Sequence, residues 1–375
     1  MIYFDNAATT VPCKAACDGV MNGLKNFGNP SSLHRLGLEA EKLVTAARET
    51  IAVAIGADSS EIFFTSGATE SSNTAIMGAV KKHGKRKKKI VTTAVEHPSV
   101  AAVCTQLEAD GFEIVRISPN QDGEIEANEI ISAVDDNTFL VTCMLVNNEN
   151  GYILPIQKTF SVIKKRYPDV ITHCDCVQAF MKIPVKSKKL NADMISLSAH
   201  KIHGPKGIGA LYVKKGTKIP SLVYGGGQER DFRSGTESVP LICGFGAAVN
   251  ELLPTITERF EYVKDLQKYL FDCCEKSGFH VNSTVECSPY VNSIAVENLK
   301  SEVLLHFLEE KEIYVSSGSA CSKGKKSGVL GEFGVDEKYM DSTIRISFCS
   351  DNTKDEIRAL INALKEAENK LCKIR

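Results

Sequence analysis

Short apolar runs alternate with helical stretches through the first two thirds of the chain. Seven runs have the length and composition of buried strands, at 61–65, 90–93, 112–117, 139–146, 170–174, 192–197 and 208–213. Helical stretches occupy several intervals between them, at 70–80, 99–110 and 159–166. Strands joined by helical crossovers predict a mostly parallel sheet that is covered by helices on both faces.

The pattern changes after about residue 251. Three long segments of helical periodicity, at 251–277, 301–311 and 353–371, flank short strand-like runs at 293–296 and 343–348. The pattern therefore predicts an α/β protein with a second, smaller α+β domain at the C-terminal end of the chain.

Composition narrows the functional classes without choosing among them. With 375 residues the chain is long enough for a large core and two domains. Its 45 basic and 46 acidic side chains nearly cancel, so no overall positive field indicates nucleic-acid binding. One segment, Lys81 to Lys89 (KKHGKRKKK), is strongly basic. We interpret it as a solvated loop, with a partner-binding patch as the alternative.

The cysteines and the first residues bear on location. The opening MIYFD shows no basic segment followed by an apolar one, and no stretch approaches the roughly 18 apolar residues of a membrane span. Thirteen cysteines without paired CxxC spacing favour reduced thiols over disulfides, and a zinc site at 173–176 fails on spacing. We expect a cytoplasmic protein with no membrane contact and no bound metal.

The loops after the strands are where a ligand is expected, because ligands of α/β sheets bind beyond the carboxyl ends of the strands. The loop from Ser66 to Glu70 passes through small residues into a helix, and a helix start with exposed N–H groups suits a phosphate. Taken alone, this turn favours a plain N-cap by Thr69. His97 follows the next strand and suits ring stacking or proton transfer, although a lone loop histidine is more often merely solvated.

Polar residues follow the later strands as well. Asn148 lies in the turn NNENG, where its amide suits a polar ligand atom if it is not simply a turn residue. Asp175 interrupts the end of an apolar strand, and a buried carboxylate needs a partner such as a protonated pyridine nitrogen. Lys201, preceded by Ser198 and His200, lies between two strand-like runs. Lysine readily forms a Schiff base with an aldehyde cofactor, whereas most lysines are simply exposed.

Two later segments add anion-binding and sulfur chemistry. The stretch 225–236 (GGGQERDFRSGT) joins three glycines to Arg, Ser and Thr, which suits an anion better than a flexible linker. Cys321 lies in the small-residue loop SSGSACS beside three lysines, so we expect an exposed thiol in positive surroundings that favour the thiolate. Arg345 lies within a strand-like run, where it could hold a carboxylate bidentately.

Together these segments resemble the cysteine desulfurases of the IscS/NifS type, which are pyridoxal-phosphate enzymes of the class V aminotransferase group. The resemblance runs from YFDNAATT at 3–10 to at least Arg345, and its motifs in order are SGATE, NNE, SAHKIHGPKGIGALYV, RSGT and SSGSAC. It implies the type I fold of pyridoxal-phosphate-dependent transferases, with a large cofactor-binding domain at 15–250. Residues 1–14 and 251–375 would form the small domain, and the protein would be a homodimer.

The resemblance also implies a role for each candidate residue. Lys201 would bind the aldehyde of pyridoxal phosphate, Asp175 would pair with the pyridine nitrogen, and His97 would stack on the ring and transfer protons. Asn148 and Gln178 would bind the ring's phenolic oxygen. The phosphate would be bound by Ala68, Thr69, Ser198 and His200, together with Thr236 of the neighbouring subunit. Arg345, with Asn29, would bind the substrate carboxylate.

The implied reaction removes sulfur from L-cysteine, with Lys201 as the base at Cα, and leaves alanine and a persulfide on Cys321. Sulfur would pass to an acceptor or scaffold protein docking near Cys321, for iron–sulfur cluster assembly or transfer-RNA thiolation. Cys321 would also be a candidate transient ligand of such a cluster. The long gap between Cys321 and Arg345 favours the type with a long mobile cysteine loop. The basic sequence SKGKKSGVLGEF after Cys321 departs from the family's pattern and leaves the acceptor open.

Cys174 and Cys176 also depart from the pattern, but both are small enough to flank Asp175. Three alternatives remain at this point. A selenocysteine lyase would also use a cysteine at this position, whereas an aminotransferase of the same fold would not need Cys321. A non-catalytic scaffold, with basic loops that bind RNA or a partner, would have no use for the full set of Lys201, Asp175, His97 and Cys321.

Overall fold

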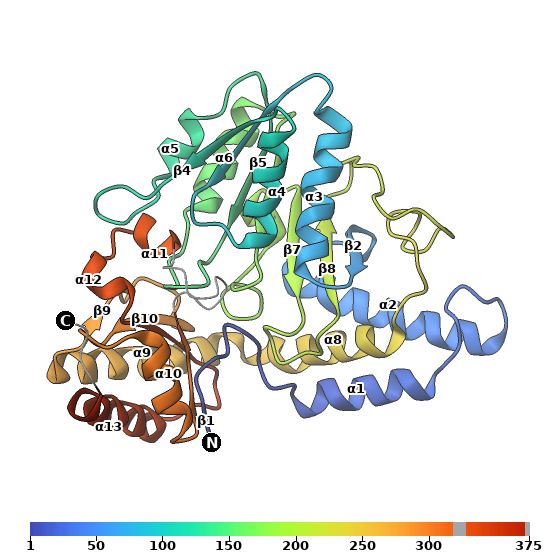
Figure 1. The fold of residues 1–375 in the computed structure, drawn as a ribbon. Helices are drawn as coiled ribbons and strands as arrows, with labels where there is room; N and C mark the ends of the chain where they lie inside the picture. Colours follow the sequence, from blue (N-terminus) through green and yellow to red (C-terminus); the bar gives the residue numbers. More distant parts are fainter. Residues whose placement is uncertain (318–327, 372–375) are drawn as a thin grey trace.

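The computed structural model describes residues 1–317 and 328–371 and contains a seven-stranded sheet, in the order β2-β8-β7-β6-β5-β3-β4 (Figure 1). Its strands are β2 (Ile62–Thr65), β3 (Lys89–Thr93), β4 (Glu113–Ile117), β5 (Thr138–Met144), β6 (Ile171–Asp175), β7 (Met194–Ser198) and β8 (Gly209–Val213). The five strands from β4 to β7 pair in parallel, and β8 runs antiparallel to both of its neighbours. The expectation of a mostly parallel sheet of seven strands is confirmed.

Helices cover both faces of this sheet, as the crossover pattern predicts. Strand residues alternate between two cores, because successive side chains of a strand point to opposite faces. On β3, for example, Ile90 joins one core and Val91 the other. One core lies under α3 (Ala68–His83) and α4 (Pro98–Ala109). The other lies under α2 (Arg35–Ile55), α5 (Ala127–Ser132), α6 (Ile156–Arg166), α7 (Ser187–Leu190) and α8 (Val239–Leu252).

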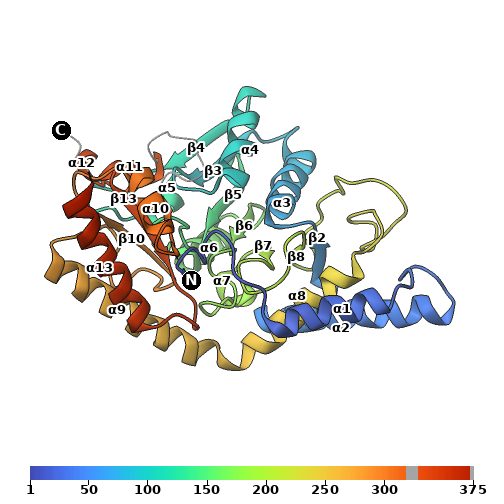
Figure 2. The same ribbon diagram turned by 60° about the horizontal axis from the view of Figure 1, so that its bottom comes forward.

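Two long helices near the start of the chain complete the second layer. Helix α1 (Lys14–Lys25) and helix α2 both pack against α8. Figures 1 and 2 show that the far ends of α1 and α2 extend beyond the sheet, away from the C-terminal part of the chain. The expected helix at 251–277 begins later, as α9 (Ile256–Ser277), because Pro254, which has no N–H donor, lies in the short 3-10 turn η2 (Leu253–Thr255) that separates α9 from the end of α8.

A second, four-stranded antiparallel sheet is built by the C-terminal part of the chain. Its order is β12-β13-β10-β9, with strands β9 (His280–Val281), β10 (Val291–Ala295), β12 (Ser316–Ser317) and β13 (Thr343–Ser347). The associated helices are α9, α10 (Ser301–Glu309), α11 (Gly328–Glu332), α12 (Glu337–Met340) and α13 (Lys354–Lys370).

The N-terminal residues join this second part. β1 (Ile2–Tyr3) pairs in parallel with β11 (Ile313–Tyr314). Phe4 and Ala7 are buried in an apolar core whose other members lie between Val263 and Ala367. This packing fits a small domain that combines both ends of the chain; the boundaries at 14/15 and 250/251 stay a prediction.

One helical stretch, Val239–Ser277, is long and apolar enough to cross a membrane by length and composition alone. It comprises α8, η2 and α9, and half of its most apolar window is buried inside the protein. The core helix of a soluble protein has the same properties, so this stretch is weak evidence of a membrane span.

Candidate active site

A cavity of about 770 Å³ lies at the carboxyl ends of the parallel strands, where β13 and the N-terminal segment meet the large sheet. Its walls include ten of the residues that the sequence singled out, which are Ala68, Thr69, His97, Asn148, Asp175, Gln178, Ser198, His200, Lys201 and Arg345. Segments that are far apart in the sequence therefore converge on one site, as expected for the ligand position of an α/β sheet.

Lys201 lies three residues after β7, in a turn that faces the cavity. Its Nζ donates hydrogen bonds to the carbonyl oxygens of Ala7 (2.6 Å) and Ala8 (2.7 Å). The same N-terminal segment is tied to the Lys201 turn a second time, because Thr10 N and Oγ1 both donate to the carbonyl of His200. The Lys201 amine is thus held by the carbonyls of Ala7 and Ala8, and the turn that carries it is held by Thr10.

Asp175 is the last residue of β6 and is buried in the cavity wall. Burial raises the pKa of its carboxyl group to about 6, against smaller lowering effects of the Val177 N–H and the charge of Lys201. The Val177 N–H donates to Asp175 Oδ1 over 2.9 Å. A cationic ring nitrogen placed against this carboxylate would favour its charged form.

His97 is the N-cap of α4, and its Nδ1 accepts the Ser99 N–H over 3.1 Å. That bond places the proton of the neutral ring on Nε2. Burial, and then the charge of Lys201, lower the pKa of His97 to about 4, so the ring is neutral near pH 7. A neutral imidazole at the cavity wall can stack on an aromatic ligand and exchange a proton.

An anion site is formed by the start of α3 together with Ser198. The first N–H groups of α3 open onto the cavity at Ala68 and Thr69. Ser198 is buried at the end of β7, and its Oγ has no hydrogen-bond partner among the described residues. A buried hydroxyl in the cavity wall without a partner is satisfied by a ligand oxygen, such as that of a phosphate.

Close packing brings the α3 turn against the sheet. A side chain at Gly209 would place its Cβ 2.6 Å from the Leu197 carbonyl oxygen and 2.8 Å from Gly67 Cα. Only glycine therefore lets β8 approach the turn that leads into α3. The position of the anion site depends on this contact.

Arg233 does not face the anion site that its RSGT segment suggested. Its Nε and Nη2 donate to the two carboxylate oxygens of Glu70, over 2.7 and 3.1 Å. Burial alone would raise the pKa of Glu70, but hydrogen bonds from Arg233 and Ser66 together lower it. Arg233 therefore balances the charge of an acid in the first turn of α3 and fixes the segment 225–236 against that turn.

Arg345 extends from β13 to the opposite wall and is buried. Three of its N–H donors are used, by the carbonyl of Asn148 (3.0 Å), Asp5 Oδ1 (3.0 Å) and Ser316 Oγ (3.1 Å). Its Nε has no partner among the described residues. Of the five donors of a guanidinium, two thus remain for a ligand carboxylate.

Several wall residues were missed by the sequence reasoning, which gave no role to Asp5, Ala7, Ala8 or Ser316. Asp5 is the one that could have been found, because an acid in the small-residue segment YFDNAATT is an unusual polar group next to a buried Phe4. Ala7 and Ala8 act through backbone carbonyls, which no side-chain pattern reveals.

Two predicted site residues, Asn29 and Thr236, do not line the cavity that the described residues form. Asn29 is exposed in the connection between α1 and α2, and Thr236 is exposed beside a neighbouring small pocket that shares Ser66 and Gly207 with the cavity. Cys321 lies outside the described residues. All three stay predictions.

The residues present fit pyridoxal phosphate. Its phosphate would meet the α3 N-terminus and the unpartnered Ser198 hydroxyl, its ring nitrogen would meet Asp175, and Lys201 would supply the amine for its aldehyde. No group of three or more histidine, cysteine and acidic side chains that could hold a metal ion occurs in residues 1–317 and 328–371.

Comparison with known proteins agrees with this arrangement. Residues 2–360 match the family model described as aminotransferase class V. The chain belongs to this family. A cysteine desulfurase of Nostoc sp. is 39% identical over 381 residues, covering 99% of this chain and 94% of that protein. A cysteine desulfurase IscS of Methanosarcina thermophila is 37% identical over 376 residues, covering 99% and 92%.

A solved structure described as a NifS-like protein has a TM-score of 0.93 and 36% identity to this chain, covering 99% of it and 100% of the other. The resemblance to the IscS/NifS type and the expected fold of this class V family are therefore confirmed over nearly the whole chain.

Proposed function

We propose that this protein is a pyridoxal-phosphate-dependent cysteine desulfurase that converts L-cysteine to L-alanine and carries the sulfur as a persulfide on Cys321. The observation that carries the proposal is the convergence of Lys201, Asp175, His97 and Arg345 on one cavity. Full-length similarity to cysteine desulfurases supports it.

Bound pyridoxal phosphate would supply an electron sink for removal of the proton at the substrate Cα. Asp175 would hold the ring nitrogen protonated, and Asn148 and Gln178 would flank the phenolic oxygen. Lys201, released from the aldehyde by the incoming amine, would be the base at Cα. The neutral His97 ring would stack on the cofactor and accept or return a proton at the substrate.

Arg345 would bind the substrate carboxylate. Asp5, Ser316 and the Asn148 carbonyl hold its guanidinium in place, and its Nε is buried without a partner among the described residues, so a carboxylate that reached this atom would form a strong charged hydrogen bond. Within this one chain, Asn29 does not reach the cavity, so its part in the clamp needs the neighbouring subunit.

The segment that contains Cys321 leaves β12 at Ser317, next to the cavity residue Ser316. The overall step is balanced: L-cysteine and the Cys321 thiol give L-alanine and the Cys321 persulfide. No outside oxidant or reductant is needed.

The protein would work as a cytoplasmic homodimer. Large apolar side chains are exposed on α1 and the loop after it, with Met21 54%, Leu24 55%, Phe27 78% and Leu33 92% exposed. A partner subunit that covers them would bury these apolar side chains and could contribute Thr236 to the phosphate site.

The persulfide on Cys321 would pass to an acceptor protein for iron–sulfur cluster assembly or transfer-RNA thiolation.

The test is mass spectrometry of the holoenzyme after addition of L-cysteine. We expect a gain of one sulfur atom on the peptide that contains Cys321, with alanine as the product. Cys321→Ala should lose sulfide release yet keep the absorption of the bound cofactor near 420 nm. The matched control is Cys17→Ala, which removes an exposed thiol on α1 and should change neither.

Three other outcomes, one of them from a parallel assay with selenocysteine, would contradict the proposal in whole or in part. Sulfide release that survives Cys321→Ala would contradict the persulfide step. Turnover of selenocysteine without turnover of cysteine would indicate a selenocysteine lyase. A protein that takes up no cofactor would indicate a scaffold.

A further inference from the structure

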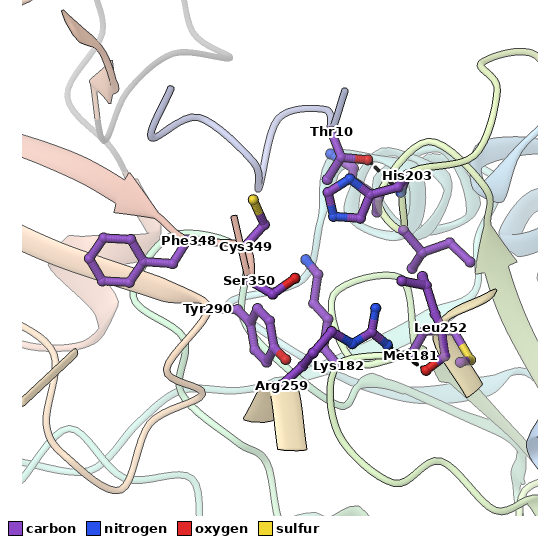
Figure 3. A pocket seen from close by; sticks show the side chains of 12 residues that line it. Thr10, Met181, Lys182, His203, Leu252, Arg259, Tyr290, Phe348, Cys349 and Ser350 are labelled. Carbon is purple, nitrogen blue, oxygen red and sulfur yellow. Dashed lines mark hydrogen bonds between the residues drawn. The ribbon is translucent and has the colours of Figure 1, made fainter. Parts of the chain in front are cut away.

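A buried lysine that the proposed reaction does not use lies directly behind the active-site wall. Lys182 is 5% exposed and follows the Asp175–Gln178 turn of β6. It lines a small cavity of about 20 Å³ together with Lys201, Arg259, Tyr290 and other residues. Figure 3 shows the Lys182 side chain among the residues that surround this cavity.

A chain of hydrogen bonds joins Lys182 to Lys201. Lys182 Nζ donates to Gln178 Oε1 (2.8 Å), and Gln178 Nε2 donates to the Ala7 carbonyl (2.9 Å). The same carbonyl accepts the bond from Lys201 Nζ (2.6 Å). Because a protonated lysine only donates, Lys182 in its charged form holds the amide oxygen of Gln178 toward itself and the NH₂ group toward the Ala7 carbonyl.

The backbone at this point is strained, which indicates that the inward direction of Lys182 is held by its surroundings. The preceding Met181 has φ +59°, a left-handed conformation that residues with a side chain seldom adopt. The ammonium also lies 5.9 Å from the centre of the Tyr290 ring.

Lys182 is one of the charged groups that act on Lys201. Charge interactions couple Lys201 to Asp175, His97, His200 and Lys182. Burial lowers the pKa of both histidines to about 4, so they are neutral near pH 7. Asp175 favours a protonated Lys201 and Lys182 disfavours it, because like charges repel.

The other groups around Lys182 do little to offset its positive charge. Burial, followed by the charges of Lys201 and Arg345, lowers the pKa of Lys182 to about 7, and Cys349 acts weakly in the other direction. Arg259 and His203, which also line the small cavity, add no negative charge. Lys182 and Lys201 are therefore two basic groups of like charge, linked through the Gln178 amide and the Ala7 carbonyl.

We propose that Lys182 is a positioning residue of the reaction centre: its donor fixes the Gln178 amide, and its charge opposes protonation of the Lys201 nitrogen. The inference rests on the proposed function, because it assigns Lys182 a task only if Lys201 binds the cofactor. A lysine that merely filled space would be replaceable by methionine without a change at Lys201.

Three variants separate the donor from the charge. Lys182→Met removes both, Lys182→Gln keeps a donor without the charge, and Lys182→Arg keeps both. The matched control is Lys186→Met, because Lys186 is half-buried four residues further on and donates to the Ala54 carbonyl instead.

The main readout is the absorbance of each cofactor-loaded protein as a function of pH, which follows protonation of the Lys201 nitrogen bound to the cofactor aldehyde. We expect the midpoint to rise by about one pH unit in Lys182→Met and Lys182→Gln, and to stay near wild type in Lys182→Arg and Lys186→Met. The affinity for pyridoxal phosphate should fall severalfold in Lys182→Met and less in Lys182→Gln, because only methionine leaves the Gln178 amide free to rotate.

The outcomes distinguish this inference from the proposed function. Wild-type protein that forms no absorbing complex with pyridoxal phosphate would overturn the proposed function itself. Wild-type protein that binds the cofactor, with a midpoint that is unchanged in both Lys182→Met and Lys182→Gln, would overturn the inference alone. If Lys182→Met does not fold, as thermal unfolding of the cofactor-free protein would show, the comparison of Lys182→Gln with Lys182→Arg decides the charge effect.

Discussion

Burial shifts the pKa values of several single side chains around the cavity. The pKa of His97 falls to about 4, that of Asp175 rises to about 6, and that of the adjacent buried Glu96 rises to about 8. In each case desolvation of the charged form is the largest cause. A cationic ring bound against Asp175 would reverse that residue's shift, so the cofactor-free and cofactor-bound proteins should differ in their dependence on pH.

The variant Asp175→Asn tests whether the pKa of Asp175 is raised in the cofactor-free protein. The folded-state pKa of about 6 exceeds the unfolded value of about 3.9, so the carboxyl group stabilises the fold below pH 3.9, and this contribution is lost as the pH rises through 6. The shift of about two units corresponds to about 3 kcal/mol. Relative to wild type, the free energy of unfolding of Asp175→Asn should therefore rise by about that amount between pH 4 and pH 7.

Urea unfolding at a series of pH values measures this difference. Asp18→Asn, which changes an exposed acid on α1, is the control and should follow the wild-type curve. Parallel curves for Asp175→Asn and wild type would contradict the prediction.

Arg345→Lys tests the carboxylate clamp. Lysine keeps the charge but lacks the planar set of donors that Asp5, Ser316 and the Asn148 carbonyl now hold in place. We expect KM for L-cysteine to rise about tenfold, with a smaller change in kcat, because one charged hydrogen bond to the substrate is lost. Steady-state alanine production measures both constants, and Arg116→Lys, at a surface ion pair with Glu108, is the control. An unchanged KM would argue against the clamp.

At the scale of elements, the site depends on how closely a strand and a helix turn approach each other. Gly209 on β8 lies against Gly67, the N-cap of α3, and α3 supplies the N–H groups of the anion site. The position of those N–H groups is therefore set by the large sheet and does not depend on α3 alone.

Gly209→Ala should push the α3 turn away from β8. The new methyl group would lie within 3 Å of the Leu197 carbonyl and of Gly67. Overpacking of this kind costs about 1–3 kcal/mol, so we expect a lower melting temperature and about tenfold weaker binding of pyridoxal phosphate. Thermal unfolding and cofactor titration measure the two effects, and Gly328→Ala, in open space, is the control. Wild-type affinity in Gly209→Ala would show that the turn tolerates displacement.

The sequence predicted these elements unevenly. The large sheet was predictable because its strands are continuous apolar runs between helical stretches, and the strand-end positions of Asp175 and Ser198 followed from it. Helices α1 and α2 were not predicted, because long parts of them are polar and exposed; α1 packs on α8, and α2 packs on α8 and on β2. The two-residue strands β1 and β11 carry no periodicity at all.

The site, too, was only partly predictable from sequence patterns. Side chains after strands were found because an α/β sheet gathers its strand ends at one edge. The carbonyls of Ala7 and Ala8 were missed, since they reach the cavity only through tertiary packing of the first residues, whereas Asp5 was overlooked as an acid within a small-residue segment. Lys182 was missed because one lysine in a mixed segment gives no sign of burial.

At the scale of the whole molecule, the apolar side chains of α1 and of the loop that follows it are exposed to solvent in the single chain. Phe27→Glu, alone or with Leu24→Glu, places a charge where we expect the partner subunit. The dimer should then dissociate at micromolar protein concentration, and cofactor affinity should fall with it if Thr236 of the neighbour contributes to the phosphate site.

Sedimentation and cofactor titration of the same samples test both parts. Val285→Glu is the control, because Val285 is 50% exposed on the smaller part of the molecule, away from α1. A Phe27→Glu protein that sediments as wild type would show that the dimer interface lies elsewhere. A monomeric Phe27→Glu protein with full cofactor affinity would argue against a contribution of the neighbour's Thr236 to the phosphate site.

The N-terminal segment connects the two sheets at the point of reaction. Phe4 is fixed in the core of the smaller part, while the carbonyls of Ala7 and Ala8 grip the lysine that extends from the large sheet. A bound molecule wide enough to force the two sheets apart would also draw those carbonyls off the amine. The hold on the Lys201 amine therefore depends on how the smaller part of the molecule packs on the large sheet.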